Sequence, residues 1–485
     1  MKKNLAVVLT LVGFMMSLAQ GADKVNEQRA ELYKETLRPQ FHFTGRYWNN
    51  YTLNPQKGQE GWINDVNGLV YYDGEYHLFA QQWGRCWIHA VSKDLLHWKQ
   101  LPSILQEDAK FGWSASGSAF VDWQNTAGLQ TGKEKVLVAF YTGWKFFAQC
   151  MAYSNDKGRT WTKYDKNPVL ACQNRNPKED RDPKVFWYEP DKKWVMVLFV
   201  HPGYMFFSSK DLKTWEKLSE MGGFSECPDM FPLPLDGDPK HMKWVLVNGD
   251  GTYVVGEFDG VKFSPETERC RMDWGPHFYA TQTWSDMPAT DGRRIQMAWM
   301  NGGKYQDMPF SQQLTFPCEL TLRTIPEGVR VFRYPVKEID QLHAGKTVVN
   351  DRILKPGENP LSAIEGELFD MAVEIDMSKS DFKEIVFDLR GIVVKYTASN
   401  NLLTSFGSRA EPCGCRAELK PRSGMLQLRM LVDRMSVETF GNRGEVSLTH
   451  VVRANDTKPA LSLHALGGDV FIKSLAVHEL KSIWQ

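Results

Sequence analysis

The chain has 485 residues, more than one hydrophobic core usually supports, so we expect two domains. Its 58 basic residues balance 58 acidic residues, which gives no electrostatic basis for binding nucleic acid or an anionic membrane surface and favours a neutral substrate. Aromatic residues make up 12% of the chain and include 17 Trp; this suits stacking on the apolar faces of sugars, although we expect most of these Trp to pack a β core.

The first 22 residues have the pattern of a secretory signal peptide. Lys2 and Lys3 form a basic start, residues 5–18 are apolar, and the small residues Ala19, Gly21 and Ala22 follow. The apolar run is too short for a comfortable membrane span. We therefore expect an exported, soluble protein, periplasmic or extracellular, with residues 1–22 removed.

After this segment the chain reads as short β-strands. Runs of Val, Phe, Tyr, Trp and Leu alternate with turns, and helical periodicity is nearly absent. In residues 68–79 the pair Asp73-Gly74 predicts a hairpin turn between two strands. Residues 195–200 and 244–247 are further predicted buried strands.

A weak internal repeat indicates how these strands are grouped. A Ser-x-Asp turn followed by Trp occurs three times, starting at Ser92, Ser154 and Ser209. Recurrence at roughly 50 residues with several strands per unit is typical of a propeller. We expect an all-β chain with a five-bladed β-propeller over residues 40–335, and a series of β-sandwiches as the alternative. The expected blades begin near these residues: Trp62, Trp113, Arg181, Glu226 and Tyr279.

The pattern changes near residues 324–345, where Pro326, Gly328 and Pro335 interrupt it. Beyond this point, residues 367–376 and 426–433 alternate apolar with polar side chains, which is typical of a β-sandwich. We expect a C-terminal β-sandwich domain over residues 345–485. Three roles stay open for it: stiffening the propeller, binding polysaccharide, or mediating dimerisation.

Cysteine and histidine spacing predicts no metal site and no cofactor. Eight Cys are few for this length and announce no disulfide framework. Residues 413–415, Cys-Gly-Cys, have no second Cys or His pair at ligand spacing. Four histidines are better read as structural or as minor polar contacts: His77, His89, His97 and His277.

Three acidic segments beside turn-forming or rigid residues carry the strongest functional signal. They are Trp-Ile-Asn-Asp-Val-Asn-Gly at 62–68, Arg-Asp-Pro at 181–183 and Glu-Cys-Pro-Asp at 226–229. Two carboxylates around one pocket are the minimum for cleaving a glycosidic bond, and a third suits holding sugar hydroxyls. Since the innermost strand of every propeller blade lines the central channel, Asp65, Asp182 and Glu226 are expected to converge there.

These segments, in this order, resemble the sequence blocks of glycoside hydrolase family 32, the invertases, levanases and inulinases. Residues 116–119, 278–282, 314–320 and 432–440 are similar to further blocks, so the resemblance covers almost all of the mature chain. It implies a retaining mechanism with Asp65 as nucleophile, kept ionised by Asn64 and backbone amides, and Glu226 as general acid. Asp182 would bind ring hydroxyls and stabilise the oxocarbenium-like transition state. Arg181 would orient it, with a purely structural Arg–Asp pair as the alternative.

The resemblance also implies contacts around the fructosyl unit from Asn64, Gln81, Trp87 and Ser116, with Trp113 or Trp62 as a wall. The chain departs from the family pattern near this pocket at Val66, at residues 82–84 (Gln-Trp-Gly) and at Ala115. These changes alter pocket walls rather than carboxylates, so they bear on substrate preference.

The sequence therefore predicts an exported β-fructosidase that releases terminal fructosyl units from sucrose, levan or inulin through a covalent fructosyl-enzyme. Its expected partner is a fructose-containing oligo- or polysaccharide, and no nucleic acid or membrane span is expected. Three alternatives stay open: a fructosyltransferase with the same residues, another five-bladed propeller glycosidase, and a non-catalytic fructan-binding protein.

Overall fold

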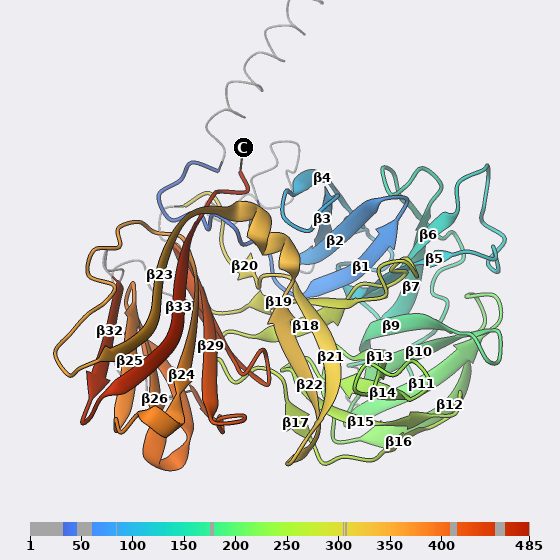
Figure 1. Cartoon of the computed structure of the whole chain (residues 1–485). Helices are drawn as coiled ribbons and strands as arrows, with labels where there is room; N and C mark the ends of the chain where they lie inside the picture. Colours follow the sequence, from blue (N-terminus) through green and yellow to red (C-terminus); the bar gives the residue numbers. More distant parts are fainter. Residues whose placement is uncertain are drawn as a thin grey trace, which may run out of the picture. The chain divides into compact units, whose positions relative to one another are not determined.

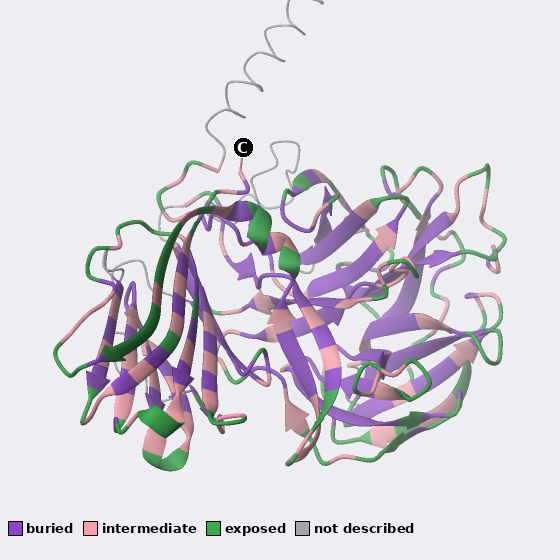
Figure 2. Cartoon of the chain, in the orientation of Figure 1, coloured by how far each residue is buried: buried purple, intermediate pink, exposed green. Residues whose placement is uncertain are grey.

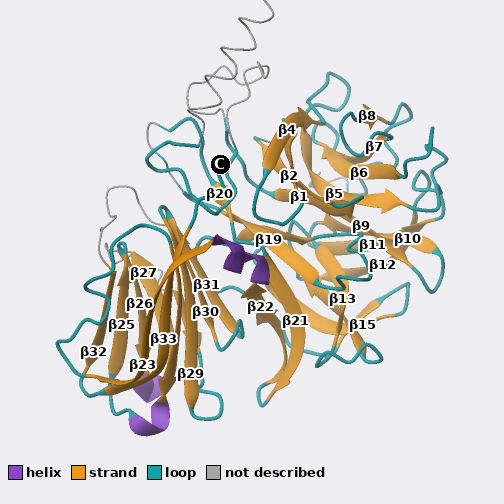
Figure 3. Ribbon diagram, turned by 45° about the horizontal axis from the view of Figure 1, so that its top comes forward, coloured by secondary structure: helices purple, strands orange, loops and turns teal. Residues whose placement is uncertain are grey.

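The computed structural model describes residues 33–45, 61–83, 85–174, 179–303, 305, 308–407, 415–451 and 461–484. The chain divides into two units, Met1–Arg38 and Pro39–Gln485. Residues 33–38 are the described part of the first unit and form a short turn; the predicted signal peptide lies outside the described residues. The second unit is almost entirely β, with a few short 3₁₀ helices (Figure 3). In the described part of the chain, no helix combines the length and apolarity that crossing a bilayer requires.

Five antiparallel sheets follow one another between residues 66 and 335, which confirms the predicted five-bladed propeller (Figure 1). Blade 1 contains β1 (Val66–Tyr72), β2 (Glu75–Gln82), β3 (Cys86–Ser92) and β4 (Lys99–Ile104). Blade 2 contains β5 (Ser114–Asp122), β6 (Val136–Gly143), β7 (Ala148–Ser154) and β8 (Thr162–Lys163). Blade 3 contains β9 (Arg181–Tyr188), β10 (Lys193–Val200), β11 (Gly203–Ser209) and β12 (Glu216–Gly222). Blade 4 contains β13 (Asp229–Pro234), β14 (Met242–Val247), β15 (Thr252–Phe258), β16 (Phe263–Pro265) and β17 (Cys270–Arg271). Blade 5 contains β18 (Tyr279–Thr283), β19 (Arg294–Met300), β20 (Gln313–Leu314), β21 (Cys318–Ile325) and β22 (Gly328–Pro335).

The turns anticipated from the sequence connect the strands of these blades. Asp73 and Gly74 join β1 to β2 with positive φ angles of 49° and 83°, as a tight hairpin requires. Each Ser-x-Asp turn joins the third strand of a blade to the fourth. In the first of them, one carboxylate oxygen of Asp94 accepts hydrogen bonds from the backbone N–H groups of Leu96 (3.0 Å) and His97 (2.9 Å). In this turn, the Asp side chain of the repeat therefore satisfies backbone N–H groups of the turn itself.

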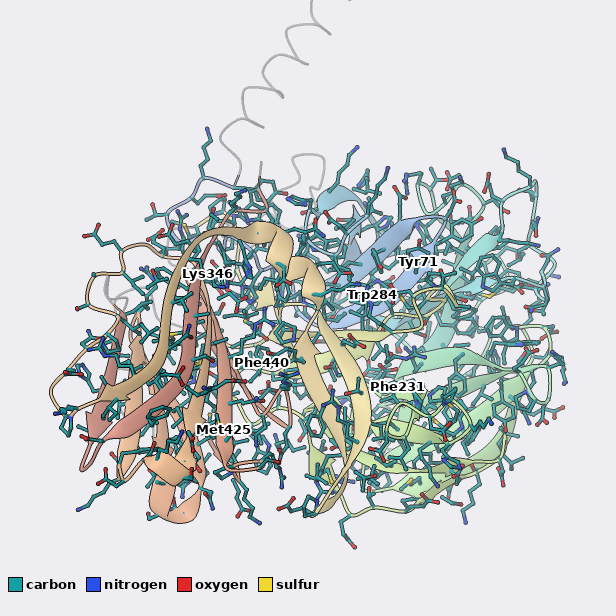
Figure 4. The ribbon with its side chains drawn as sticks, in the orientation of Figure 1. Tyr71, Phe231, Trp284, Lys346, Met425 and Phe440 are labelled. Carbon is teal, nitrogen blue, oxygen red and sulfur yellow. The ribbon has the colours of Figure 1, made fainter. Side chains whose placement is uncertain are left out.

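Blade 5 closes the ring against blade 1. The N–H of Tyr71 donates to the carbonyl of Ser285 (3.0 Å), and the N–H of Ser285 donates to the carbonyl of Leu69 (2.8 Å). Trp284, which is fully buried, donates from Nε1 to the carbonyl of His77 (3.1 Å) (Figure 4). Separate hydrophobic clusters fill the spaces between adjacent blades. Closure fixes the inner strands β1, β5, β9, β13 and β18 around one axis.

Two further sheets form the C-terminal β-sandwich, as predicted. Figure 2 shows several of its strands, such as β25 and β26, alternating between buried and intermediate residues, with the outer strand β23 largely exposed. One sheet has the order β23-β33-β24-β29-β30-β31, and the other β28-β27-β26-β25-β32. Their bounds are β23 (His343–Leu354), β24 (Phe369–Asp376), β25 (Glu384–Leu389), β26 (Ile392–Thr397), β27 (Leu402–Gly407), β28 (Cys415–Glu418), β29 (Met425–Asp433), β30 (Ser436–Gly441), β31 (Val446–Val451), β32 (Leu461–Leu466) and β33 (Val470–Leu480), with the helices η1 (Lys337–Leu342), η2 (Met377–Lys379) and η3 (Ala398–Asn400). The first sandwich strand thus begins at His343, slightly before residue 345.

Most of the seven described cysteines are buried; Cys172 and Cys270 are partly exposed. Residues 413 and 414 of the Cys-Gly-Cys segment lie outside the described residues.

A buried charge cluster joins the segment before the first blade to the sandwich. His42 lies between two carboxylates, with Nδ1 2.8 Å from Asp433 and Nε2 2.8 Å from Glu438. Burial alone lowers the pKa of His42, but the two carboxylates outweigh it and raise that pKa to about 9. Arg333 of β22 completes the cluster through Glu438 (2.9 Å) and Asp273 (3.4 Å). Phe440 covers it between the propeller and the sandwich (Figure 4).

His42→Gln removes a buried cation and leaves Asp433 and Glu438 without it. We expect the free energy of unfolding to fall by roughly 3–5 kcal/mol below neutral pH. Because the folded pKa of His42 is raised from 6.5 to about 9, its stabilisation is fully present below pH 6.5 and is lost as pH rises through about 9. Unfolding midpoints measured across this pH window test both effects.

The matched control is His97→Gln, which removes an exposed imidazole 2.8 Å from Asp94. We expect this control to change stability by less than about 1 kcal/mol. Equal losses in the two variants, or wild-type stability that does not change through the window, would contradict the prediction.

Candidate active site

Asp65, Asp182 and Glu226 line one pocket of about 270 Å³. Asp65 immediately precedes β1, Asp182 is the second residue of β9, and Glu226 lies just before β13. All three therefore lie at the same end of the inner strands. The predicted residues Trp62, Asn64, Gln81, Trp113 and Arg181 line the same pocket.

Irregular backbone near the starts of the inner strands directs these side chains. The pairing register breaks between Asn67 and Val70 in β1, and between Tyr279 and Gln282 in β18. Asp182 and Cys227 adopt left-handed φ angles of 62° and 55°, which are uncommon for residues with a side chain. Bulges and strained φ angles recur at functional sites, where they re-aim side chains that a regular strand would place elsewhere.

Three side-chain O–H and N–H groups donate hydrogen bonds to Asp65. Ser116 Oγ lies 2.7 Å from Oδ2, Asn64 Nδ2 lies 3.2 Å from Oδ1, and Gln81 Nε2 lies 3.3 Å from Oδ2. Burial raises the pKa of Asp65 above its ordinary value, against the bonds from Ser116 and Asn64, and the charge of Glu226 adds to the increase. Asn64 is one of these donors, as expected, but burial raises the pKa of Asp65 and so opposes the expected ionised state. The anticipated backbone amides are not among its donors in the described chain.

Asp182 is held by the backbone around it. Its own N–H donates to Thr142 Oγ1 (3.1 Å), and its Oδ2 accepts from the N–H of Cys227 (3.0 Å). The Cys227 thiol lies 3.6 Å from this oxygen and 3.7 Å from Oδ2 of Asp65, so it bridges the two carboxyl groups. Burial raises the pKa of Asp182 to about 7, with a further increase from Asp65 and an opposing effect of Arg181.

Glu226 is the most exposed of the three, with 36% of its side chain accessible. Tyr279 OH donates to its Oε1 (2.8 Å) and Arg181 Nε donates to its Oε2 (3.3 Å). Arg181 lies further from Asp182, at 3.9 Å, and packs over the Phe199 ring. The guanidinium therefore positions Glu226 more directly than Asp182, which differs from the predicted role.

Tryptophan rings form the walls of the pocket. Trp62 stacks on Trp83 with ring centroids 4.0 Å apart, and Trp113 lies parallel to Trp144 at 6.5 Å. Trp113 and Trp144 are 41% and 39% exposed, unusually high for large apolar side chains. Trp299 completes the lining. The pocket thus combines aromatic faces with carboxylates, the equipment that a sugar ring requires.

Two predicted contacts lie behind the pocket. Ser116 is buried and reaches the site through its bond to Asp65. Trp87 is fully buried, donates from Nε1 to the carbonyl of Ala115 (3.0 Å) and packs in the core between blades 1 and 2. The structure therefore does not place Trp87 on the pocket wall, because its strand β3 lies two strands out from the central axis.

Sequence reasoning gave several residues of this site no role in it. The sequence marks Trp83 only as a departure from the family pattern, and Tyr279 only as the start of a blade within a block similar to the family, residues 278–282. Trp144 and Trp299 carried no local signal, because they come from turns and strands of other blades.

Comparison with known proteins assigns the chain. Residues 55–335 match the glycosyl hydrolases family 32 N-terminal domain, and residues 338–479 match the family 32 C terminal. The chain belongs to glycosyl hydrolase family 32. It is therefore a glycosidase of the β-fructofuranosidase type, built from a propeller and a sandwich.

Similar proteins within family 32 include bacterial and fungal enzymes. The levanase of Bacillus subtilis (strain 168) is 39% identical over 532 residues, covering 100% of this chain and 76% of the levanase. The extracellular exo-inulinase of Aspergillus ficuum is 30% identical over 530 residues, covering 92% of this chain and 96% of the inulinase. The crystal structure of the exo-inulinase from Aspergillus awamori matches with a TM-score of 0.81 at 27% identity, covering 93% of this chain and 100% of that one.

Ser116→Ala should raise the pKa of Asp65 further, because the bond from Ser116 favours the ionised carboxylate. We expect the acidic limb of the pH profile of kcat/KM to move to higher pH, with activity near neutral pH about tenfold lower. The control is Ser114→Ala on the same strand, whose buried hydroxyl has no hydrogen-bond partner among the described residues. Identical pH profiles for the two variants would refute the role given to Ser116.

Proposed function

We propose that this family 32 enzyme removes terminal fructosyl units from fructans such as levan or inulin, and from sucrose, with retention of anomeric configuration. The observation that carries the proposal is the single pocket lined by Asp65, Asp182 and Glu226. The names of the levanase and exo-inulinases among its relatives support the choice of fructan.

In the proposed mechanism, a carboxylate oxygen of Asp65 attacks the anomeric carbon while Glu226 protonates the departing glycosidic oxygen. Water then attacks the fructosyl-enzyme ester, Glu226 removes its proton, and Asp65 leaves as a carboxylate. Retention requires that these two carboxyl groups lie about 5–5.5 Å apart. Tyr279 and Arg181, both bonded to Glu226, would hold the acid towards the leaving oxygen.

Asp182 would accept hydrogen bonds from ring hydroxyls and stabilise the positive charge that develops on the sugar ring. Burial raises the pKa of Asp182 to about 7 and also raises that of Asp65, and the charges of the neighbouring carboxylates add to both increases. In the retaining mechanism Asp65 attacks as a carboxylate and Glu226 donates the proton.

The size of the pocket favours attack at chain ends. Its volume of about 270 Å³ lies just below the range for ligand sites, about 300–1,000 Å³, and several of its walls are aromatic rings. Such a pocket accommodates one terminal sugar more readily than the middle of a chain. Export, indicated by the pattern of residues 1–22, would bring the enzyme to polymeric substrate.

Asp65→Asn and Glu226→Gln keep the side-chain volume but remove the nucleophile and the acid. We expect turnover to fall by roughly 10²–10⁴-fold or more in each, with unchanged thermal unfolding. Glu220→Gln on the outer strand β12, an exposed carboxylate paired with Lys217 at 2.7 Å, is the control and should keep full activity. Near-normal turnover in either active-site variant would end the assignment.

Incubation with sucrose, levan and inulin, followed by chromatography, tests the reaction itself. We expect fructose as the product from fructans at every time point. Ladders of shorter oligosaccharides would instead indicate internal cleavage, and oligosaccharides longer than the substrate would indicate fructosyl transfer.

A further inference from the structure

A second cavity, of about 500 Å³, lies at the opposite end of the inner strands from the catalytic pocket. Strand β9 connects the two sites, because Asp182 near its start lines the pocket and Trp187 near its end lines the cavity. At a rise of about 3.3 Å per residue, these positions are about 17 Å apart along the strand. One sugar unit cannot fill both sites.

Aromatic rings dominate the walls of this cavity. They are Phe120, Phe186, Trp187, Tyr188, Trp194, Phe231 and Trp244, together with the exposed Trp123. Trp123 is 45% exposed, yet it is held in place, since its Nε1 donates to Asp286 Oδ1 (2.8 Å). Because this exposed ring is held in one orientation by a carboxylate, its face is available for a ligand to stack on.

Polar groups converge on the same space. Asp286 uses its other oxygen to accept the N–H of Val121 (2.9 Å), and burial raises its pKa to about 6 against both of its hydrogen bonds. Arg294 donates to the carbonyl of Trp284 (2.9 Å), and its guanidinium lies over the Phe231 ring at 5.2 Å. Phe231 and Trp284, which are labelled in Figure 4, both lie in the propeller.

The charges of this lining balance. Lys184 forms an ion pair with Asp229 at 2.9 Å, and the remaining cation and anion are Arg294 and Asp286. On the rim, Glu189 accepts from Trp187 Nε1 and is also paired with Lys192. A site for an anion would carry excess positive charge, and a purely apolar ligand would not require buried charged groups. The lining suits a neutral ligand with apolar faces and many hydroxyl groups.

We propose that this cavity is a non-catalytic binding site for a neutral oligosaccharide stretch, separate from the catalytic pocket. Sugar C–H faces would stack on Trp123 and its aromatic neighbours, while hydroxyl groups would bond to Asp286 and Arg294. The identification of the ligand as fructan rests on the proposed function. The site would hold the enzyme on a polymer while chain ends enter the pocket on the other face, raising their effective concentration.

The test uses the full-length mature protein and four variants. Trp123→Ala removes the exposed ring, Trp123→Phe keeps a stacking face but loses the bond to Asp286, and Trp187→Ala removes a second wall. Trp274→Ala, a 40% exposed tryptophan outside this cavity, is the matched control. Retention is measured by affinity electrophoresis in gels with and without levan or inulin, and kcat/KM is measured on sucrose.

We expect the wild type and Trp274→Ala to be retarded by fructan, and Trp123→Ala and Trp187→Ala to lose at least fivefold in apparent affinity. Trp123→Phe should keep most of the retention. Sucrose kcat/KM should stay within about twofold of wild type in every folded variant, because sucrose needs only the catalytic pocket.

Equal retention of wild type, Trp123→Ala and Trp187→Ala would overturn the proposal, as would parallel losses of retention and sucrose turnover. A wild type that hydrolyses fructan but shows no retardation would overturn this inference and leave the proposed function intact. A wild type that neither hydrolyses nor binds fructan would overturn both.

Discussion

Three carboxyl groups share one small pocket at the end of the inner strands, and their mutual repulsion in a desolvated space is the constraint around which the site is built. Burying a carboxylate is costly unless donors satisfy it, and each of the three has its own set. Asp65 has Ser116, Asn64 and Gln81.

The donors to the other two carboxyl groups come from other blades. Asp182 receives the backbone N–H of Cys227, and Glu226 receives Tyr279 and Arg181. Asp65 stands before blade 1, Asp182 in blade 3, Glu226 before blade 4 and Tyr279 in blade 5, so the arrangement exists only when the ring is closed. The hydrogen bonds between Tyr71, Ser285 and Leu69 close the ring, and they therefore also keep the three carboxyl groups and their donors together. The sandwich supports the same closure, because Glu438 binds His42 ahead of blade 1 and Arg333 at the end of blade 5.

The parts that the sequence predicts well are those encoded locally. Asp73-Gly74 specifies a hairpin through its φ angles, and the Ser-x-Asp turns specify the link between third and fourth strands through their own hydrogen bonds. The carboxylate segments stand out because Gly, Pro and strained residues must accompany a side chain aimed into a channel. Convergence of Asp65, Asp182 and Glu226 then follows from propeller geometry alone.

The site residues that the sequence does not predict correctly are those whose positions depend on contacts between strands and blades. Trp87 pairs with Gln81 across neighbouring strands, yet Gln81 lines the pocket while Trp87 fills the core between blades, because the two strands differ in distance from the axis. Trp144 and Trp299 reach the pocket only once their blades are docked. The Ser116 contact depends on the register break in β5, which no local pattern announces.

The two ends of the inner strands differ in charge, which fits the proposed division between catalysis at one end and binding at the other. At the catalytic end, Asp65, Asp182 and Glu226 face Arg181, the one cationic side chain among the described residues that line this pocket, so negative charge is in excess there. At the opposite end, Lys184 is paired with Asp229, and both oxygens of Asp286 accept hydrogen bonds, from the N–H of Val121 and from Trp123 Nε1. Both ends offer aromatic faces and hydrogen-bonding groups, so both suit hydroxyl-rich ligands. On these proposals, the difference between cleaving and retaining a sugar lies in the local excess of negative charge.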